Sequence, residues 1–268
     1  MFAKLKSIFG VDSASEKKVI FWSEAATEYL APIPAASAIP EWWRKTKSYG
    51  GFKNYKTDEK QINIKTGGDN ATIKRCMPVL DSMSMGYLVL SPADIYIEPK
   101  HVHKKEDNTE GTKGFAMIYP RHYEKIDYHP WGQANKHPYA TEQKLAKVFV
   151  PWRIALPEGY SLIMTEPLNN PSPYWSVVSG VMDSDVFFPR LNFMMSIKED
   201  GFKGTVPMGT PIAQLIPFKR EKWSSVVIDN AAKTDPGSHS KKRIVDSRLA
   251  KVFSGAYKKF FWSKKDFR

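Results

Sequence analysis

The segment LNFMMSIK, residues 191–198, decides the fold class because its apolar residues fall on every second position. The apolar positions are Leu191, Phe193, Met195 and Ile197. Asn192, Ser196 and Lys198 lie on the other side, where only Met194 interrupts the polar pattern. Alternation with a period of two is typical of a strand that buries one face. We therefore predict a half-buried β-strand here.

Similar short apolar runs recur throughout residues 73–218, bounded by Pro, Gly, Asn or Asp. They are GYLVLSPADIYIE, GFAMIY, KVFVPWRIAL, GYSLIMTE and PIAQLIPF. Several such strands at short spacing favour a sandwich or barrel over a parallel α/β sheet. Within this region only ATEQKLAKVF (140–149) has a helical pattern. The sequence thus predicts a mainly β domain over residues 73–218.

Residues 1–72 are the expected N-terminal arm and loop region, in which VIFW (19–22) has the pattern of a short strand. Three prolines in residues 30–45 exclude a helix and favour extended chain. Trp42 and Trp43 cannot share one face of a strand, so we expect one to cover the core edge and the other to pack elsewhere. Alternatively, the pair forms a platform for a base or a proline peptide.

Residues 219–268 are the expected C-terminal appendage, basic and partly helical from about residue 240. They hold 14 Lys and Arg against 5 Asp and Glu, which is +9 of the chain's net charge of +12. Such an asymmetry favours contact with nucleic acid, an acidic protein surface or a membrane. A solvated tail is the alternative.

The composition excludes several classes of protein. The single cysteine, Cys76, rules out an internal disulfide and a cysteine-based zinc cluster. No window approaches 18 apolar residues, and the first ten residues lack the features of a secretory signal. We therefore expect no transmembrane segment and no secretion.

Asp183 and Asp185 lie within the otherwise apolar run SGVMDSDVFFPRLNF (179–193). Buried carboxylates are unfavourable unless they are paired or hydrogen-bonded. The favoured interpretation is a tight turn in which the carboxylates bind the main-chain amides of the turn itself. The other interpretation is a catalytic acid pair.

Two motifs resemble the dUTPase and dCTP deaminase superfamily: GVMDSD (180–185) and GTPIAQL (209–215). The strand LPEGYSLIMTEP (156–167) is similar to the one that precedes the first motif in that family. The resemblance implies a dUTPase-like (β-clip) barrel or sandwich in which GVMDSD forms a hairpin and GTPIAQLIPF its return. It also implies Asp183 as the general base that activates water, with Mg²⁺ as the metal if the chain is an enzyme.

The same resemblance implies a nucleotide pocket near the motifs. Its expected residues are Asp185, Val186, Phe187 and Gln214, with Arg153 and Arg190 as possible sources of positive charge. The chain departs from the family at decisive positions, because Val186 and Phe187 replace the tyrosine region and EPLN (166–169) lacks the phosphate-binding arginine and serine. Since charge neutralisation dominates phosphoryl transfer, the motifs favour a non-catalytic protein.

Most of the chain resembles a family of uncharacterised proteins of tailed bacteriophages. The segments that carry this likeness include TIKRCMPVLDSMSMGYLVLSPADIYIE (72–98) and YKKFFWSKKDF (257–267). We therefore predict a phage protein that uses a dUTPase-like fold as a structural or binding module. The resemblance also implies a location in the host cytoplasm or the virion. The alternatives are a divergent pyrimidine deoxynucleotide hydrolase or deaminase, and a basic nucleic-acid-binding protein.

The predicted partners are phage structural proteins, nucleic acid and further copies of the chain, with a trimer as the assembly that the dUTPase resemblance implies. The expected contact residues are Trp42, Trp43, Lys241, Lys242, Arg243, Lys258 and Lys259.

HVH (101–103) places two imidazoles on one strand face, but two ligands do not define a metal site, so we predict no bound metal. The loop at 121–139 mixes His, Tyr and Trp and either fills its own small core or stacks on bases.

Overall fold

The computed structural model describes part of the chain. The described residues are 17–24, 30–50, 60, 70–101, 113–118, 127–129, 131–140, 145–188, 190–198, 202–227 and 257–265. Within them the chain is mainly β, and every strand pair is antiparallel. This confirms the prediction of a mainly β protein.

The first sheet has the strand order β1-β7-β11-β9, with β6 also pairing with β7. Its strands are β1 (Ile20–Trp22), β6 (Asp127–Tyr128), β7 (Ala146–Ala155), β9 (Trp175–Val177) and β11 (Arg190–Ile197). β11 is the strand predicted from LNFMMSIK, and its four predicted inward residues are all buried. β1 confirms the strand predicted at VIFW.

The second sheet has the order β10-β8-β13-β3-β2. Its strands are β2 (Ile33–Pro34), β3 (Tyr87–Leu90), β8 (Tyr160–Thr165), β10 (Gly180–Met182) and β13 (Pro211–Lys219). β13 is the central strand, and its residues 212–216 are all buried. A third sheet has the order β12-β4-β5 and consists of β4 (Ile95–His101), β5 (Lys113–Ile118) and β12 (Gly204–Val206).

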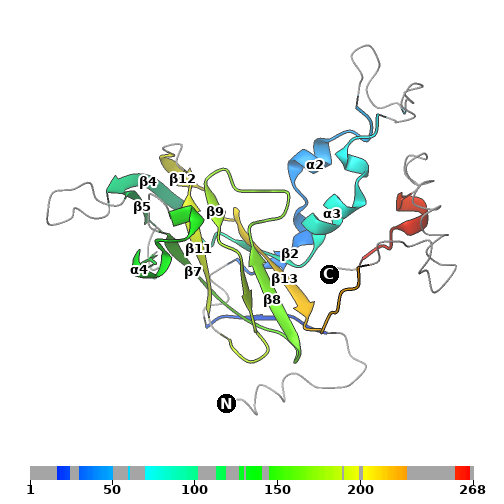
Figure 1. The fold of residues 1–268 in the computed structure, drawn as a ribbon. Coiled ribbons are helices and arrows are strands. Elements are labelled where there is room, and N and C mark those ends of the chain that lie inside the picture. The colour runs from blue at the N-terminus through cyan, green and yellow to red at the C-terminus, as the bar shows by residue number, and fades with distance from the viewer. Residues whose placement is uncertain are drawn as a thin grey trace.

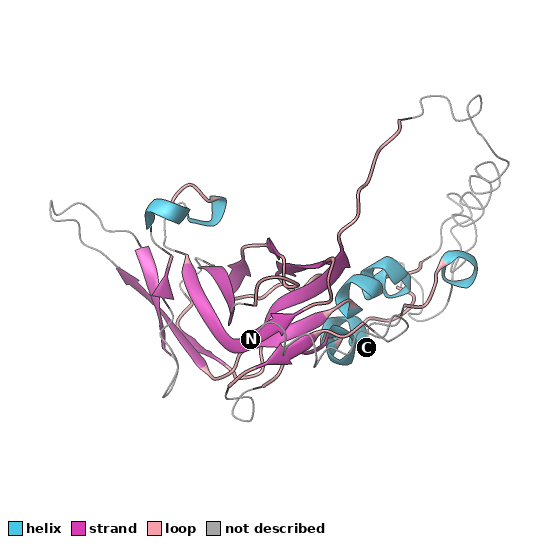
Figure 2. Cartoon of the chain, turned by 90° about the horizontal axis from the view of Figure 1, so that it is seen from below, coloured by secondary structure: helices cyan, strands magenta, loops and turns pink. Residues whose placement is uncertain are grey.

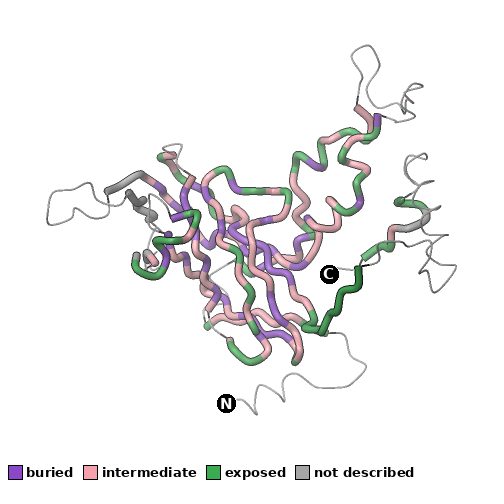
Figure 3. Tube along the Cα trace, in the orientation of Figure 1, coloured by how far each residue is buried: buried purple, intermediate pink, exposed green. Residues whose placement is uncertain are grey.

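One apolar core joins the three sheets. The largest fully buried side chains include Trp175 and Phe193 from the first sheet, Leu162 from the second and Ile95 from the third. Figure 3 shows the buried positions concentrated along the strands of the β body. Residues 20–22, 30 and 33–34 belong to this body, because β1 and β2 pair with β7 and β3, and Trp152 Nε1 donates to Leu30 O (2.9 Å).

The helices are short and lie mainly at one end of the β body, opposite the third sheet (Figure 1, Figure 2). They are α2 (Glu41–Lys45), α3 (Met77–Ser84), α4 (Trp131–Ala134), three 3₁₀ turns at 35–38, 73–75 and 138–140, and one π-helical turn at 257–261. Gly86 connects α3 to β3 with φ +71°, and a Cβ there would lie 2.0 Å from Leu215 O. Only glycine fits this close approach to β13.

Three local predictions were wrong. The described residues of 140–149 do not form the predicted helix, since residues 138–140 make a 3₁₀ turn and β7 begins at Ala146. The prolines of 30–45 do not exclude helix, because a 3₁₀ turn fits between Pro34 and Pro40, and α2 begins directly after Pro40. Proline is compatible with a helix start, where its missing N–H has no partner to lose.

The third correction concerns the two motif segments, which are not hairpins. β10 belongs to the second sheet, whereas β11, which follows it, belongs to the first. β12 and β13 likewise lie in different sheets. Both motifs therefore turn the chain from one sheet into another. No helix among the described residues has the length and apolar character needed to span a bilayer.

Candidate functional site

Residues 183–188, here called the aspartate corner, carry the chain from β10 to β11. The backbone closes a tight turn, because the amides of Val186 and Phe187 both donate to Asp183 O (3.3 and 3.1 Å). Ser184 O accepts from Leu156 N (3.0 Å), which fixes the corner to the end of β7. The predicted tight turn is thus present, but it joins two sheets.

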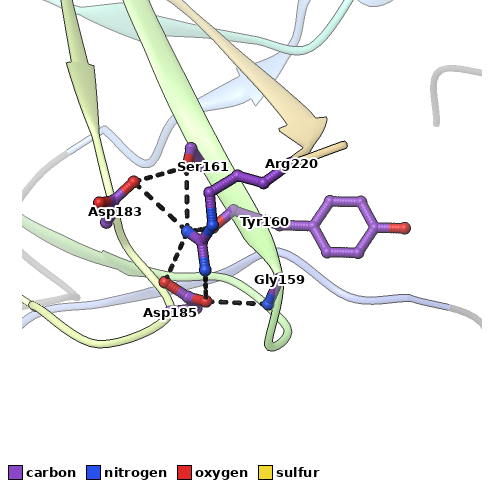
Figure 4. Close-up of polar contacts among 6 residues, drawn as sticks. All are labelled: Gly159, Tyr160, Ser161, Asp183, Asp185 and Arg220. Atoms are coloured by element: carbon purple, nitrogen blue, oxygen red, sulfur yellow. Dashed lines mark hydrogen bonds and ion pairs between the residues drawn. The ribbon is translucent and has the colours of Figure 1, made fainter. Parts of the chain in front are cut away.

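Arg220, the residue directly after β13, ties the corner to two other segments. Its guanidinium lies between the two carboxylates (Figure 4). Nη1 donates to Asp185 Oδ1 (3.0 Å) and Nη2 to Asp185 Oδ2, which is a two-pronged ion pair. Nη1 also lies 3.3 Å from Asp183 Oδ1. Such paired hydrogen bonds between arginine and carboxylate are strong and geometrically specific.

Gly159, in the turn between β7 and β8, and Ser161, near the start of β8, are further partners. Gly159 N donates to Asp185 Oδ2 (2.8 Å), and Ser161 Oγ donates to Asp183 Oδ1 (2.6 Å). Arg220 N in turn donates to Gly159 O (2.8 Å). Three segments that are distant in sequence therefore meet at one arginine.

The two aspartates differ sharply in exposure. The side chain of Asp185 is 1% exposed, whereas that of Asp183 is 60% exposed and that of Arg220 is 39% exposed. The hydrogen bond from Arg220 lowers the pKa of Asp185, with help from the Gly159 amide, and outweighs the opposing effect of burial. The same pairing raises the pKa of Arg220. Asp185 is thus a buried, ionised and fully engaged carboxylate.

This arrangement limits what the corner can do chemically. Asp185 has no free oxygen for a substrate or a metal, and the positive charge of Arg220 is matched by two carboxylates. Asp183 Oδ2 has no protein partner among the described residues, and the side chain of Asp183 is 60% exposed. The geometry therefore serves to hold three chain segments together, and only Asp183 retains the capacity to orient a water molecule.

Gln214, an expected pocket residue, is 1% exposed and uses both ends of its amide internally. Its Oε1 accepts from Leu168 N (2.8 Å), and its Nε2 donates to Ser82 O (2.9 Å) and Met85 O (2.6 Å). It joins α3 and the loop at 166–169 to β13. This side chain satisfies buried backbone groups and presents no group to a ligand.

The two arginines expected to supply positive charge lie on neighbouring strands, at the point where β11 begins beside β7. Arg190 pairs with Arg153 of β7 in the strand register. Arg153 Nη1 donates to Phe188 O (3.0 Å), and its guanidinium lies 5.1 Å from the ring centre of Trp22. Arg153 therefore holds the far end of the aspartate corner. Val186 and Phe187, by contrast, are 67% and 62% exposed.

The two adjacent tryptophans separate as predicted. Trp43 is 3% exposed, whereas Trp42 is 38% exposed and donates from Nε1 to Asn169 O (3.1 Å). The rings are edge to face, with centroids 5.7 Å apart. Trp43 covers the core edge, and Trp42 is a surface residue in a fixed orientation.

The other expected residues are only partly covered by the structure. Lys258 and Lys259 are exposed in the turn at 257–261. Lys241, Lys242 and Arg243 lie outside the described residues, as do 102–103 of HVH and 121–126 of the His-containing loop. No group of three or more His, Cys, Asp or Glu in the described part of the chain is placed to hold a metal ion.

Sequence reasoning missed Arg220, the residue on which the site depends. It considered Arg153 and Arg190 because they lie near the motifs. Arg220 is 35 residues from Asp185, and the one available signal was a basic pair, Lys219 and Arg220, at the end of the apolar run PIAQLIPF.

Comparison with known proteins adds little to this geometry. Neither the protein-family models nor the curated proteins gave a match to the chain. Among solved structures, a mutant dUTPase of Staphylococcus bacteriophage 80alpha with dUpNHpp is similar at 11% identity, over 66% of this chain and 84% of that one, with a TM-score of 0.26. A TM-score of 0.26 is too low to establish a common fold.

The lowered pKa of Asp185 predicts a specific dependence of stability on pH. A carboxyl whose folded pKa is below its unfolded value of 3.8 stabilises the fold above about pH 4 and loses that contribution as the pH falls through its folded pKa. We expect urea unfolding of the wild-type chain to show a steeper loss of stability below about pH 4 than Asp185→Asn shows. Parallel curves for the two proteins would mean that Asp185 is not engaged as described.

Proposed function

We propose that the chain is a non-catalytic binding module of a tailed bacteriophage, built on a dUTPase-like β fold. The observation that carries the proposal is the closed pairing of Arg220 with Asp185 and Asp183 at the position where the resemblance expects a catalytic centre. The two sequence motifs support the dUTPase-like fold, and the departures at 166–169 and 186–187 support the loss of catalysis.

The internal role of Gln214 supports the same conclusion. In an enzyme of the expected kind, groups near the loop at 166–169 would face a triphosphate. Here that loop contributes Leu168 N to the amide of Gln214, and Asn169 contributes its carbonyl to Trp42. The loop thus makes its hydrogen bonds to other parts of the same chain.

A divergent hydrolase or deaminase is the second candidate, because the side chain of Asp183 is 60% exposed. Under that hypothesis Asp183 would orient the attacking water, with Mg²⁺ on the nucleotide. The positive charge for the phosphates would have to come from a residue other than Arg220.

A nucleotide panel separates the two functions. We expect dUTP, dCTP and their monophosphates, with and without Mg²⁺, to leave the melting temperature unchanged, because a ligand that binds the folded state would raise it with concentration. We also expect no release of pyrophosphate or ammonia. Turnover by the wild-type chain that Asp183→Asn abolishes, with Asp94→Asn as a matched control, would overturn the proposal.

Self-association is part of the proposed role. Residues 221–227 follow β13 as an extended segment in which every residue is exposed (Figure 3). Trp223, Val226 and Val227 are 86%, 82% and 94% exposed, an unusual state for large apolar side chains. We infer that they pack against another copy of the chain, and that Trp223→Ser with Val227→Ser lowers the mass measured by light scattering. An unchanged mass would contradict this use of the segment.

A further inference from the structure

The C-terminal segment 257–265 returns to the β body and is anchored on α3. Trp262 Nε1 donates to Asp81 Oδ2 (2.9 Å), and Lys265 Nζ donates to the same oxygen (2.6 Å). Asp81 lies in the middle of α3, and its side chain is only 18% exposed. Residues from the end of the chain thereby join a surface formed by residues 41–84.

The segment before α3 is joined to α2 in a similar way. Lys74 Nζ donates to Trp43 O and lies 5.3 Å from the centre of the Trp43 ring. The guanidinium of Arg75 lies 4.8 Å from the ring centre of Tyr49. Because 73–75 leads directly into α3, residues 41–49, 73–84 and 257–265 form one continuous surface, which we call the basic helical face.

The basic helical face has a strong excess of positive charge. Its basic residues are Arg44, Lys45, Lys47, Lys74, Arg75, Lys258, Lys259, Lys264 and Lys265. Its two acidic residues, Glu41 and Asp81, are both paired with lysines of the face. Nine basic against two acidic residues give +7, whereas the other described residues hold 14 basic and 9 acidic ones. A surface of this charge attracts a polyanion.

Aromatic rings lie among these charges. Trp42 is 38% exposed and Tyr257 is 43% exposed. Trp42 is fixed by its hydrogen bond to Asn169 and by its contact with Trp43, so its ring is already oriented before any ligand arrives. Fixed aromatic rings between lysines and arginines are the arrangement on which unpaired bases stack while the cations contact phosphates.

We propose that the basic helical face binds single-stranded nucleic acid, with its phosphates on the lysines and arginines and bases on Trp42 and Tyr257. The proposal deepens the role of the chain as a binding module and rests on it. A membrane is less suited to this face, because the exposed large apolar side chains described on it are Trp42, Ile73 and Tyr257, of which two carry a polar group.

The test measures binding of a fluorescent oligo-dT of about 20 nucleotides to the full chain at several salt concentrations. The face variant is Arg44→Ser, Lys258→Ser and Lys264→Ser. The control variant is Lys18→Ser, Lys136→Ser and Lys203→Ser, which removes the same charge from exposed sites elsewhere. At roughly 100 mM salt we expect the face variant to lose at least about tenfold in affinity and the control less than about threefold.

The salt dependence and the aromatic residue give two further readouts. Loss of three phosphate contacts should reduce the slope of log affinity against log salt by about 2. Tyr257→Leu should weaken oligo-dT binding by about fivefold or more without changing that slope, because stacking releases no counterions. Thermal unfolding of each variant confirms that the chain is folded.

Several outcomes would overturn the proposal: equal losses in the face and control variants, no binding at low salt, tighter binding to duplex DNA of the same length, or tighter binding to anionic vesicles. Nucleotide turnover is measured separately, on dUTP and dCTP. Turnover would contradict the non-catalytic function. The proposal of nucleic-acid binding would then be decided by the oligo-dT measurements alone. Absence of both turnover and oligo-dT binding would remove only the nucleic-acid contact.

Discussion

Replacing Arg220 with methionine is expected to lower the melting temperature of the chain by about 5–10 °C. Methionine keeps the aliphatic part of the side chain but removes the partner of Asp185, whose carboxylate is 1% exposed. A buried charge without its partner is strongly unfavourable, even though the pair as a whole contributes less. The side-chain link from Arg220 to the aspartate corner is lost at the same time, whereas the hydrogen bonds from Gly159 and Ser161 to the corner remain.

Lys219→Met is the matched control for this change. Lys219 is the preceding residue and is also cationic, but its ion pair with Glu221 is exposed. Pairs of that kind contribute little, so a shift below about 2 °C is expected. Differential scanning calorimetry of both variants measures the contrast. Similar small shifts would show that the Arg220 pairing is unimportant for the fold.

The second large effect is expected for Gln214→Leu, which should destabilise the chain by about 3 kcal/mol. Leucine has a similar size, but it leaves Leu168 N, Ser82 O and Met85 O without the partners that the amide provides. Unsatisfied backbone groups at a buried site cost more than the hydrogen bonds contribute when formed. Urea unfolding measures the difference in free energy.

Gln133→Leu is a suitable control, because Gln133 is exposed on α4 and lies outside the strands of the sheets. Its effect should be within about 0.5 kcal/mol. Gln214→Glu gives a further check, since a carboxylate can accept from Leu168 N but cannot donate to the two carbonyls. Stability equal to that of wild type in Gln214→Leu would contradict the internal role of the amide.

The strands were predictable where alternation was regular and one face was buried. LNFMMSIK alternates almost without interruption, and β11 follows it. The helix predicted over 140–149 was wrong because Ala, Glu, Gln, Lys and Leu all favour helix. These residues obscured the alternation of apolar and polar positions that begins at Ala146. From Ala146 to Ile154 every second residue is buried, so tertiary packing outweighed local helix propensity.

The sequence predicted a turn at the aspartate corner, but it did not predict that this turn connects two different sheets. GVMDSD contains the residues that favour a reversal, and the reversal is present. Nothing within the motif reveals which sheet each flanking strand joins. The carboxylates were expected to bind main-chain amides of their own turn, whereas their described partners are Gly159, Ser161 and Arg220 on other segments. Such contacts depend on the closed fold and leave no local pattern in the sequence.

The central claim is that Arg220 neutralises the buried side chain of Asp185. The most direct measurement is whether Asp185→Asn restores the melting temperature of Arg220→Met. Removing the buried charge should restore at least about half of the melting temperature lost in Arg220→Met, because asparagine can still accept from Gly159 N. Asp183→Asn in the same background should restore little, since Asp183 is 60% exposed. If neither substitution recovers stability, or if Asp183→Asn recovers as much as Asp185→Asn, the corner is not held together by this ion pair.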